Sequence, residues 1–294
     1  MEASVCAPTK FVAVQNKYLA SLNSDPIARK NLSLYLNLNF LYSYYLNNSK
    51  QYFGGNGEYT SLIVKRQRDL EKFWNMPNQV RVIGQHSSSL NNREILANIF
   101  EIYGETSTRA EAYDIADKFL ARNRASANLP ESPFFSADGF ATPDKLIVIG
   151  DGLVKMIAET GVAADIVWSG VLAHEWAHQV QFKNYRNWYP EGAATDPAAA
   201  TRYTELEADF MAAYYLTHKR GATYNWKRVK QFFTLFFQIG DCGFTSSGHH
   251  GTPAQRLSAA TLGYELAQAA HKQGHIQNQQ EVHQYFVSKI RGIL

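Results

Sequence analysis

The chain has 294 residues, which is enough for one large domain or two smaller ones with a substantial core. Hydrophobic residues make up 45% of it and charged residues 19%, which excludes a disordered protein. The net charge is only +3 and the 29 Lys and Arg are scattered, so no nucleic-acid partner is expected. No apolar stretch reaches the roughly 18 residues of a membrane-spanning helix, so no membrane span is predicted.

Two features bear on the compartment of the protein. The first residues, MEASVCAPTK, lack the basic and apolar blocks of a signal peptide, which favours the cytoplasm. A signal removed ahead of Met1 would instead favour the periplasm or the extracellular space. Cys6 and Cys242 are the two cysteines, and they form either one long-range disulfide or two unrelated buried thiols.

Residues 1–125 are expected to form a mostly helical N-terminal region or cap. Two helices are predicted within 8–48, broken at the Ser-Asp-Pro of 24–26, although the apolar alternation over 32–40 also fits a strand. The glycine-rich FGGNGEY at 53–59 is interpreted as a connector. The predicted core-facing stripes of the first two helices are Phe11, Tyr18 and Leu19, and Leu34, Leu38, Leu41 and Tyr45. The elements predicted next are a helix over 60–75, a strand over 79–84 and one or two helices within 90–124.

After a linker at 125–133 the composition changes, and residues 126–294 are expected to form a second unit, or one compact unit with 1–125. Two strands joined by a Thr-Pro-Asp turn are predicted, and a helix with the polar motif LAHEWAHQVQ follows them. The predicted bounds are 134–141 and 145–149 for the strands, and 163–184, 196–220, 225–239, 253–272 and 279–291 for the helices. The whole pattern indicates an α+β fold with a small, mostly antiparallel sheet packed against the motif helix.

The motif places His174 and His178 four residues apart, so in a helix both imidazoles lie on one face, about 40° from each other. This spacing lets both rings bind one tetrahedral zinc ion, with Glu175 close enough to act as a general base. Two ordinary histidines on a helix are the alternative. The apolar residues around the motif disfavour that alternative, because unpaired polar groups are costly to bury.

A catalytic zinc site needs a third protein ligand, and TELEADFMAAYYL at 204–216 offers one. Glu205 and Asp209 share a helix face with Ala208, whose small side chain allows another helix to approach closely. Glu205 is therefore the candidate ligand, and Asp209 is expected to accept a hydrogen bond from a ligand histidine. Glu207 is a weaker alternative, because it lies about 200° round the helix from Glu205.

With these motifs in place, the chain resembles the gluzincin metallopeptidases, whose pattern is HExxH followed by ExxAD. HEWAHQ and ELEAD match that pattern, as in minigluzincins and CAAX prenyl proteases. FSADGFATPDKLIVIGDGLV resembles the edge strand and next strand of these families. GHHGTPAQRLSAATLGY resembles the HGxxxQR block of bacterial neutral zinc metallopeptidases. The resemblance covers residues 134–265 and implies a zincin-like fold.

The resemblance also implies roles for individual residues. One Zn2+ ion would be bound by His174, His178 and Glu205, with Glu175 as the base and Asp209 behind the ligands. An extended peptide would pair with the predicted edge strand, where the Asn of the family pattern is replaced by Asp138-Gly139. The substrate-binding residues expected on that strand are Ser136, Ala137, Asp138, Gly139 and Phe140.

The loop SSGHHGTP supplies a candidate donor to the oxyanion of a tetrahedral intermediate. His250 aligns best with the family block, while His249 and Arg256 are the alternatives. The remaining histidines are interpreted as ordinary surface or core residues: His86, His218, His271, His275 and His283.

These residues predict a zinc-dependent endopeptidase that acts on a peptide or protein substrate by means of Glu175. Two other interpretations remain open. The first is a catalytically inactive peptide- or protein-binding module on a metallopeptidase scaffold. The second is a protein with a structural metal site, closed by a fourth ligand such as His250.

Overall fold

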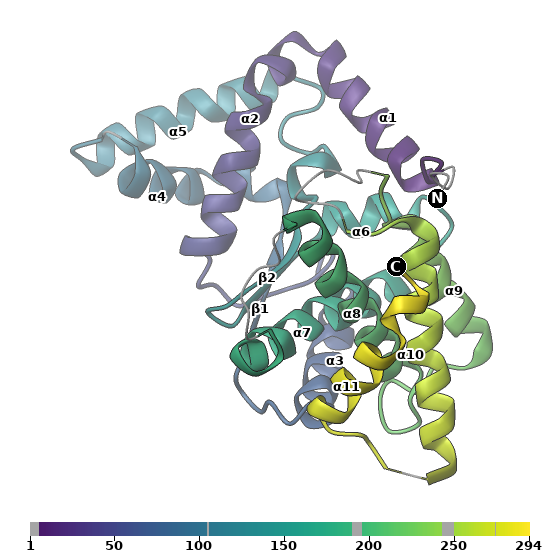
Figure 1. Ribbon diagram of the computed structural model, residues 1–294. Coiled ribbons are helices and arrows are strands. Elements are labelled where there is room, and N and C mark those ends of the chain that lie inside the picture. The colour runs from purple at the N-terminus through teal and green to yellow at the C-terminus, as the bar shows by residue number, and fades with distance from the viewer. Residues whose placement is uncertain (1–5, 105, 190–195, 243–249, 274) are drawn as a thin grey trace.

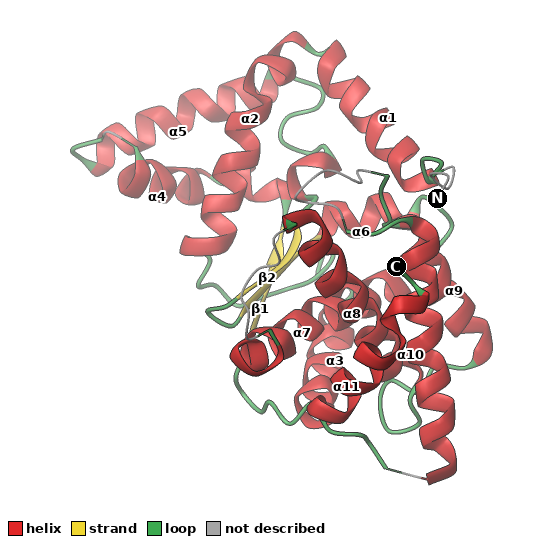
Figure 2. Ribbon diagram, in the orientation of Figure 1, coloured by secondary structure: helices red, strands yellow, loops and turns green. Residues whose placement is uncertain are grey.

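Figure 1 shows the computed structural model of the chain, which describes residues 6–104, 106–189, 196–242, 250–273 and 275–294. In these residues the fold is α+β, with eleven α-helices around one three-stranded sheet (Figure 2). None of the described helices combines the length and apolar character needed to cross a membrane. The helices are α1 (Lys10–Ser24), α2 (Pro26–Leu41), α3 (Thr60–Phe73), α4 (Arg93–Tyr103), α5 (Arg109–Arg124), α6 (Asp151–Ala158), α7 (Ala164–Trp188), α8 (Pro197–Thr217), α9 (Trp226–Gln238), α10 (Pro253–Gln273) and α11 (Gln279–Lys289).

The sheet has the strand order β1-β3-β2 and is mixed, which corrects the expectation of a mostly antiparallel sheet. β3 (Leu146–Gly150) pairs in parallel with β1 (Arg81–Gln85) and antiparallel with β2 (Gly139–Thr142). The parallel pair arises because α4 and α5 lie between β1 and β3 in the chain and act as a long crossover. All five residues of the central strand β3 are buried, as its apolar sequence LIVIG predicts.

Two stretches near the sheet differ from the prediction. Residues Pro133–Ser136 form a 3-10 turn instead of the start of a strand, because Ser132 caps the turn and Pro133 fixes its first residue. α6 was not expected. It begins directly after β3, where Gly150 and Gly152 allow the 133–136 turn to approach so closely that a Cβ would lie about 2 Å from its carbonyl oxygens.

The N-terminal helices α1 and α2 are confirmed, and the alternative of a strand over 32–40 is wrong. The predicted second stripe is wrong in part. Leu38 is buried, but Leu34 is 40% exposed and Tyr45 is 54% exposed. Tyr45 lies in a π-helical segment, Tyr42–Leu46, that continues α2, and the wider turn of this segment changes which side chains face inward.

Two large cores lie on either side of the sheet region. One packs α3, α7, α8 and α10 against the sheet, and the other packs α2 against α4, α5 and the 133–136 turn. In Figure 1, α2, α4 and α5 accordingly project as a lobe away from the body formed by α3 and α7 to α11. The first core includes residues from both sides of residue 125, and the division into units at that point stays a prediction.

The start of α1 is fastened to the end of α9. Cys6 and Cys242 form a disulfide with their Cα atoms 5.7 Å apart, which is the first of the two alternatives left open by the sequence. Beside it, the Thr9 hydroxyl donates to the carbonyl of Gln238 at 2.7 Å, and the Gln238 side chain accepts from the Phe11 amide at 3.2 Å. α1 is thereby held against the body of the molecule.

Candidate metal centre

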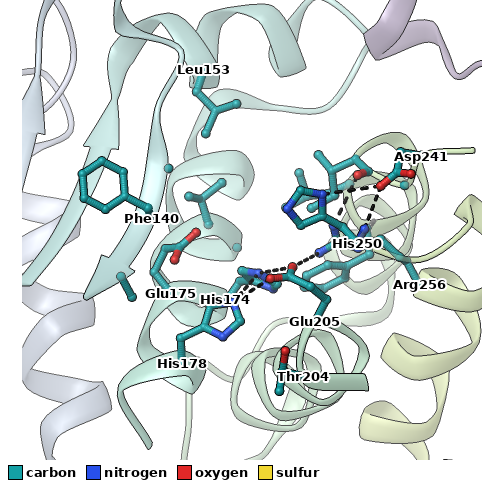
Figure 3. Close-up of a pocket in the computed structure, with 18 of the residues that line it drawn as sticks. Phe140, Leu153, His174, Glu175, His178, Thr204, Glu205, Asp241, His250 and Arg256 are labelled. Carbon is teal, nitrogen blue, oxygen red and sulfur yellow. Dashed lines mark hydrogen bonds and ion pairs between the residues drawn. The ribbon is translucent and has the colours of Figure 1, made fainter. Parts of the chain in front are cut away.

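Helix α7 positions the HExxH motif at the centre of the body. It packs between the sheet and α8, so its middle is buried on nearly all sides, and many of the residues around the motif are correspondingly apolar. His174 and His178 extend from one face of α7 with their ring centroids 4.8 Å apart and their planes nearly perpendicular. Glu205 extends toward them from α8 (Figure 3).

The ligand atoms of the two histidines and Glu205 face one another at short distances. The two Nε2 atoms are 3.2 Å apart, and the Glu205 carboxylate spans them, with Oε2 at 3.3 Å from His174 Nε2 and Oε1 at 3.3 Å from His178 Nε2. Ligands of a tetrahedral zinc ion, with bonds of about 2.0–2.1 Å, are separated by about 3.3 Å. The two imidazoles and the carboxylate are therefore close enough to hold one metal ion.

Asp209 sets the orientation of the first histidine. His174 Nδ1 lies 2.9 Å from Asp209 Oδ1 and donates to it, because a carboxylate only accepts, and Nε2 is left free as a ligand. Arg256 of α10 donates to both oxygens of Asp209, at 2.6 and 2.7 Å. Arg256 can reach Asp209 because α10 packs closely on α8 at Gly263, where a Cβ would lie 2.1 Å from the Phe210 carbonyl oxygen.

Gln181 plays the same part for the second histidine and was missed as an orienting residue. The Gln181 side-chain amide donates to the carbonyl of Thr204 at 2.9 Å and to Glu207 at 3.1 Å, so its oxygen faces His178. His178 Nδ1 donates to that oxygen at 2.8 Å, which again leaves Nε2 free. The HxxQ spacing in HQVQ was the available signal.

Glu207 faces away from the metal cluster, as its position on the helix predicted, but it is fully buried. It accepts hydrogen bonds from Tyr189 and Gln181, and His283 Nδ1 lies 2.6 Å from its other oxygen. His283 in turn stacks on Trp188 with a centroid distance of 4.2 Å. A histidine interpreted as ordinary thus belongs to the hydrogen-bond network behind the cluster.

Glu175 is the buried carboxylate beside the cluster, and it faces the cleft and β2 (Figure 3). A Cβ built on Gly139 of β2 would lie 3.7 Å from one of its oxygens. Burial raises the pKa of Glu175, and the neighbouring His174 and His178 partly oppose this shift. A carboxylate with a raised pKa is suited to accept and return a proton near neutral pH.

Charge holds the three side chains of the cluster together. Burial lowers the pKa of His174, but its hydrogen bonds to Asp209 and Glu205 outweigh burial and raise the pKa to about 10. Burial alone would raise the pKa of Glu205, yet attraction to His178 and hydrogen bonds to both histidines bring it well below the ordinary value. A cation that binds here must therefore displace protons from the histidines.

The cluster opens onto a cavity of about 660 Å³. Three of the predicted substrate-binding residues line it, namely Gly139 and Phe140 of β2 and Ala137 just before that strand. Ser136 and Asp138 are placed elsewhere. Ser136 is buried and donates to Asp151 at 2.7 Å, while Asp138 accepts from Gln85 at 2.6 Å, and burial raises the pKa of Asp138.

His250 lies on the cavity wall and is half exposed. Its backbone amide donates to Asp241 at 2.8 Å, and its Nδ1 is 3.4 Å from the same carboxylate (Figure 3). Arg256, one alternative for the oxyanion donor, is committed to Asp209 and also donates to the carbonyl of Ile239 at 3.2 Å. The other alternative, His249, lies outside the described residues.

The described residues thus bring the predicted ligands together at the wall of one cavity, with Glu175 beside them and with hydrogen bonds that orient both imidazoles. This arrangement is able to hold a divalent ion and to bring a proton acceptor next to it. Comparisons of the chain with protein-family models, with curated proteins and with solved structures find no match.

Proposed function

We propose that the protein is a zinc-dependent endopeptidase of the gluzincin type, with His174, His178 and Glu205 as the ligands of one Zn2+ ion. The observation that carries this proposal is the close approach of three side chains at the wall of a cavity, with the two Nε2 atoms 3.2 Å apart and each of them 3.3 Å from its own oxygen of Glu205. When bound, such an ion polarises a carbonyl group and lowers the pKa of water toward about 7.

Glu175 would act as the general base and then as the general acid. It would take a proton from the attacking water and pass it to the nitrogen of the leaving amine. Its burial and raised pKa suit both steps. His250, on the cavity wall, would donate to the oxygen that becomes negatively charged when the peptide carbonyl is attacked.

β2 would align the substrate. It is an edge strand, and its residues Gly139–Ala141 line the cavity next to Glu175. The far end of the strand is fastened to α7, because the Gln179 side chain donates to the carbonyl of Thr142 at 3.0 Å. An extended peptide that adds to the free edge would bring its backbone across the metal cluster.

The two rival functions differ in what they require of the site. A structural metal site is normally closed by four protein ligands, whereas the cluster among the described residues consists of three. A binding module without activity does not need a buried carboxylate at Glu175. The cluster and the carboxylate together therefore favour the peptidase.

The test is metal analysis combined with cleavage of a mixed peptide library, with and without a chelator. We expect about one zinc per chain, and loss of cleavage on chelation. Glu175→Gln is expected to lower kcat by about 10²–10⁴-fold while the metal stays bound. Glu58→Gln, at an exposed carboxylate that does not line the cavity, serves as the matched control. Cleavage that survives chelation or Glu175→Gln would refute the mechanism.

A further inference from the structure

A row of aromatic rings runs from the edge of β2 onto the N-terminal lobe. This aromatic strip consists of Phe140, Phe40, Tyr44, Tyr45 and Tyr103. Neighbouring ring centroids are 5.7 Å apart for Phe140 and Phe40, 5.5 Å for Phe40 and Tyr44, 4.4 Å for Tyr44 and Tyr45, and 6.0 Å for Tyr45 and Tyr103. The rings therefore form one continuous row of contacts from the sheet edge, through α2 and the π-helical segment, to the end of α4.

Much of this strip is exposed to solvent. Tyr45 is 54% exposed, Tyr103 46% and Phe40 37%, and Ile102 beside Tyr103 in the chain is 58% exposed. Scattered apolar residues on a surface are ordinary, but a contiguous group of large ones indicates an interaction site.

The register of β2 relates the strip to the metal cluster. Gly139 faces α7, because a Cβ there would contact Leu153, Val171 and Glu175. The next residue, Phe140, must then point to the opposite face of the sheet, where it packs against Tyr44 and Val148. Figure 3 shows the Phe140 ring directed away from Glu175.

A peptide that pairs with the free edge of β2 has the same alternation. Side chains of every second residue would face α7 and the metal cluster, and the side chains between them would face Phe140 and the rest of the strip. The occupant that fits is therefore an extended polypeptide, because the strip begins at the strand edge where such a chain would lie.

We propose that the aromatic strip is a second substrate-binding surface, which selects extended polypeptides with bulky apolar side chains at the positions that point away from the metal cluster. This inference rests on the proposed peptidase function and gives the N-terminal lobe a part in it. The contact is apolar, and burial of one large side chain corresponds to about a tenfold or greater gain in affinity.

The test compares two extended peptides with the same residues facing the metal cluster. One has leucine or phenylalanine at the alternate positions, and the other has serine there. The wild-type protein is expected to cleave the apolar peptide with the higher kcat/KM. Phe40→Ser/Tyr45→Ser is expected to lower the ratio of the two kcat/KM values about tenfold, mainly through KM. Val287→Ser, on α11 and 46% exposed, is the matched control.

Thermal unfolding of each variant separates a binding defect from misfolding. Tyr45→Ser alone repeats the test with less disturbance of packing, because Tyr45 is more exposed than Phe40. An unchanged ratio in a folded variant, or an equal loss with Val287→Ser, would overturn the inference. If the wild-type protein cleaves neither peptide, the proposed function fails on its own. In that case, fluorescence anisotropy measures the affinity of both labelled peptides for the Glu175→Gln protein. Equal affinities would overturn the inference about the aromatic strip, and tighter binding of the apolar peptide would support it.

Discussion

The buried pair of Asp209 and Arg256 allows a quantitative prediction. Both side chains are almost inaccessible, with exposures of 0% and 3%, and Asp209 accepts two hydrogen bonds from Arg256 and one from His174. Asp209→Ala leaves a guanidinium buried without its carboxylate. Removing one partner of such a pair costs about 3–5 kcal/mol, which is a large part of the 5–15 kcal/mol that a typical domain has.

The same change should weaken metal binding by about 10–100-fold, because His174 loses the acceptor that orients its ring. The assays are urea unfolding of the chelated protein and titration of the folded protein with zinc. Asp209→Asn retains an acceptor for His174 and should preserve more of the zinc affinity than Asp209→Ala.

A double variant, Asp209→Leu/Arg256→Met, provides the control for the pair. It removes both charges, so it should be more stable than Asp209→Ala while its zinc affinity stays low. If Asp209→Ala lost less than about 1 kcal/mol and bound zinc as the wild type does, the assignment of Asp209 to these two tasks would be refuted.

Three further predictions follow from other contacts. A hydrogen bond from Ser126 holds the pKa of Asp25, the N-cap of α2, at about 2. The ionised Asp25 carboxylate therefore stabilises the fold above about pH 4, and this stabilisation is lost as the pH falls toward 2. Asp25→Asn should lack this pH-dependent part of the free energy of unfolding. The prediction is wrong if, in urea unfolding between pH 5 and pH 2, the wild type and Asp25→Asn lose stability in parallel. His283→Ala should destabilise the fold by about 1–3 kcal/mol and weaken zinc binding, because it leaves buried Glu207 with an unpaired oxygen. Urea unfolding and zinc titration curves that match those of the wild type would refute this. Cys6→Ser/Cys242→Ser should cost about 2–4 kcal/mol in urea unfolding, and equal stability with and without the disulfide would count against its role.

Much of the helical architecture could be predicted from the sequence, because the relevant signals are local. Asp196 and Pro197 mark the start of α8, where the Asp196 side chain caps the helix and Pro197 is its first residue. α6 could not be predicted in this way. Its N-cap is Gly150, which provides no side-chain hydrogen bond, and its eight residues follow a strand without a turn.

The gathering of His174, His178 and Glu205 could be anticipated from the four-residue spacing and from the small residues of α8. The partners behind them were harder to predict. His283 is 76 residues from Glu207 in the sequence, and no periodic pattern links them. Likewise, the exposure of Tyr45 depends on a π-helical turn, which apolar periodicity calculated for a regular helix does not detect.

The two buried acids of α8 have a consequence for how the chain acquires its native state. Asp209 is neutralised by a residue of α10, and Glu207 is paired with a residue of α11. A nascent chain that ends before these helices lacks Arg256 and His283, so burial of α8 would carry the cost of both missing partners. Docking of the helix that supplies the third ligand is thus stabilised by the C-terminal segment, which favours assembly of the centre late in synthesis.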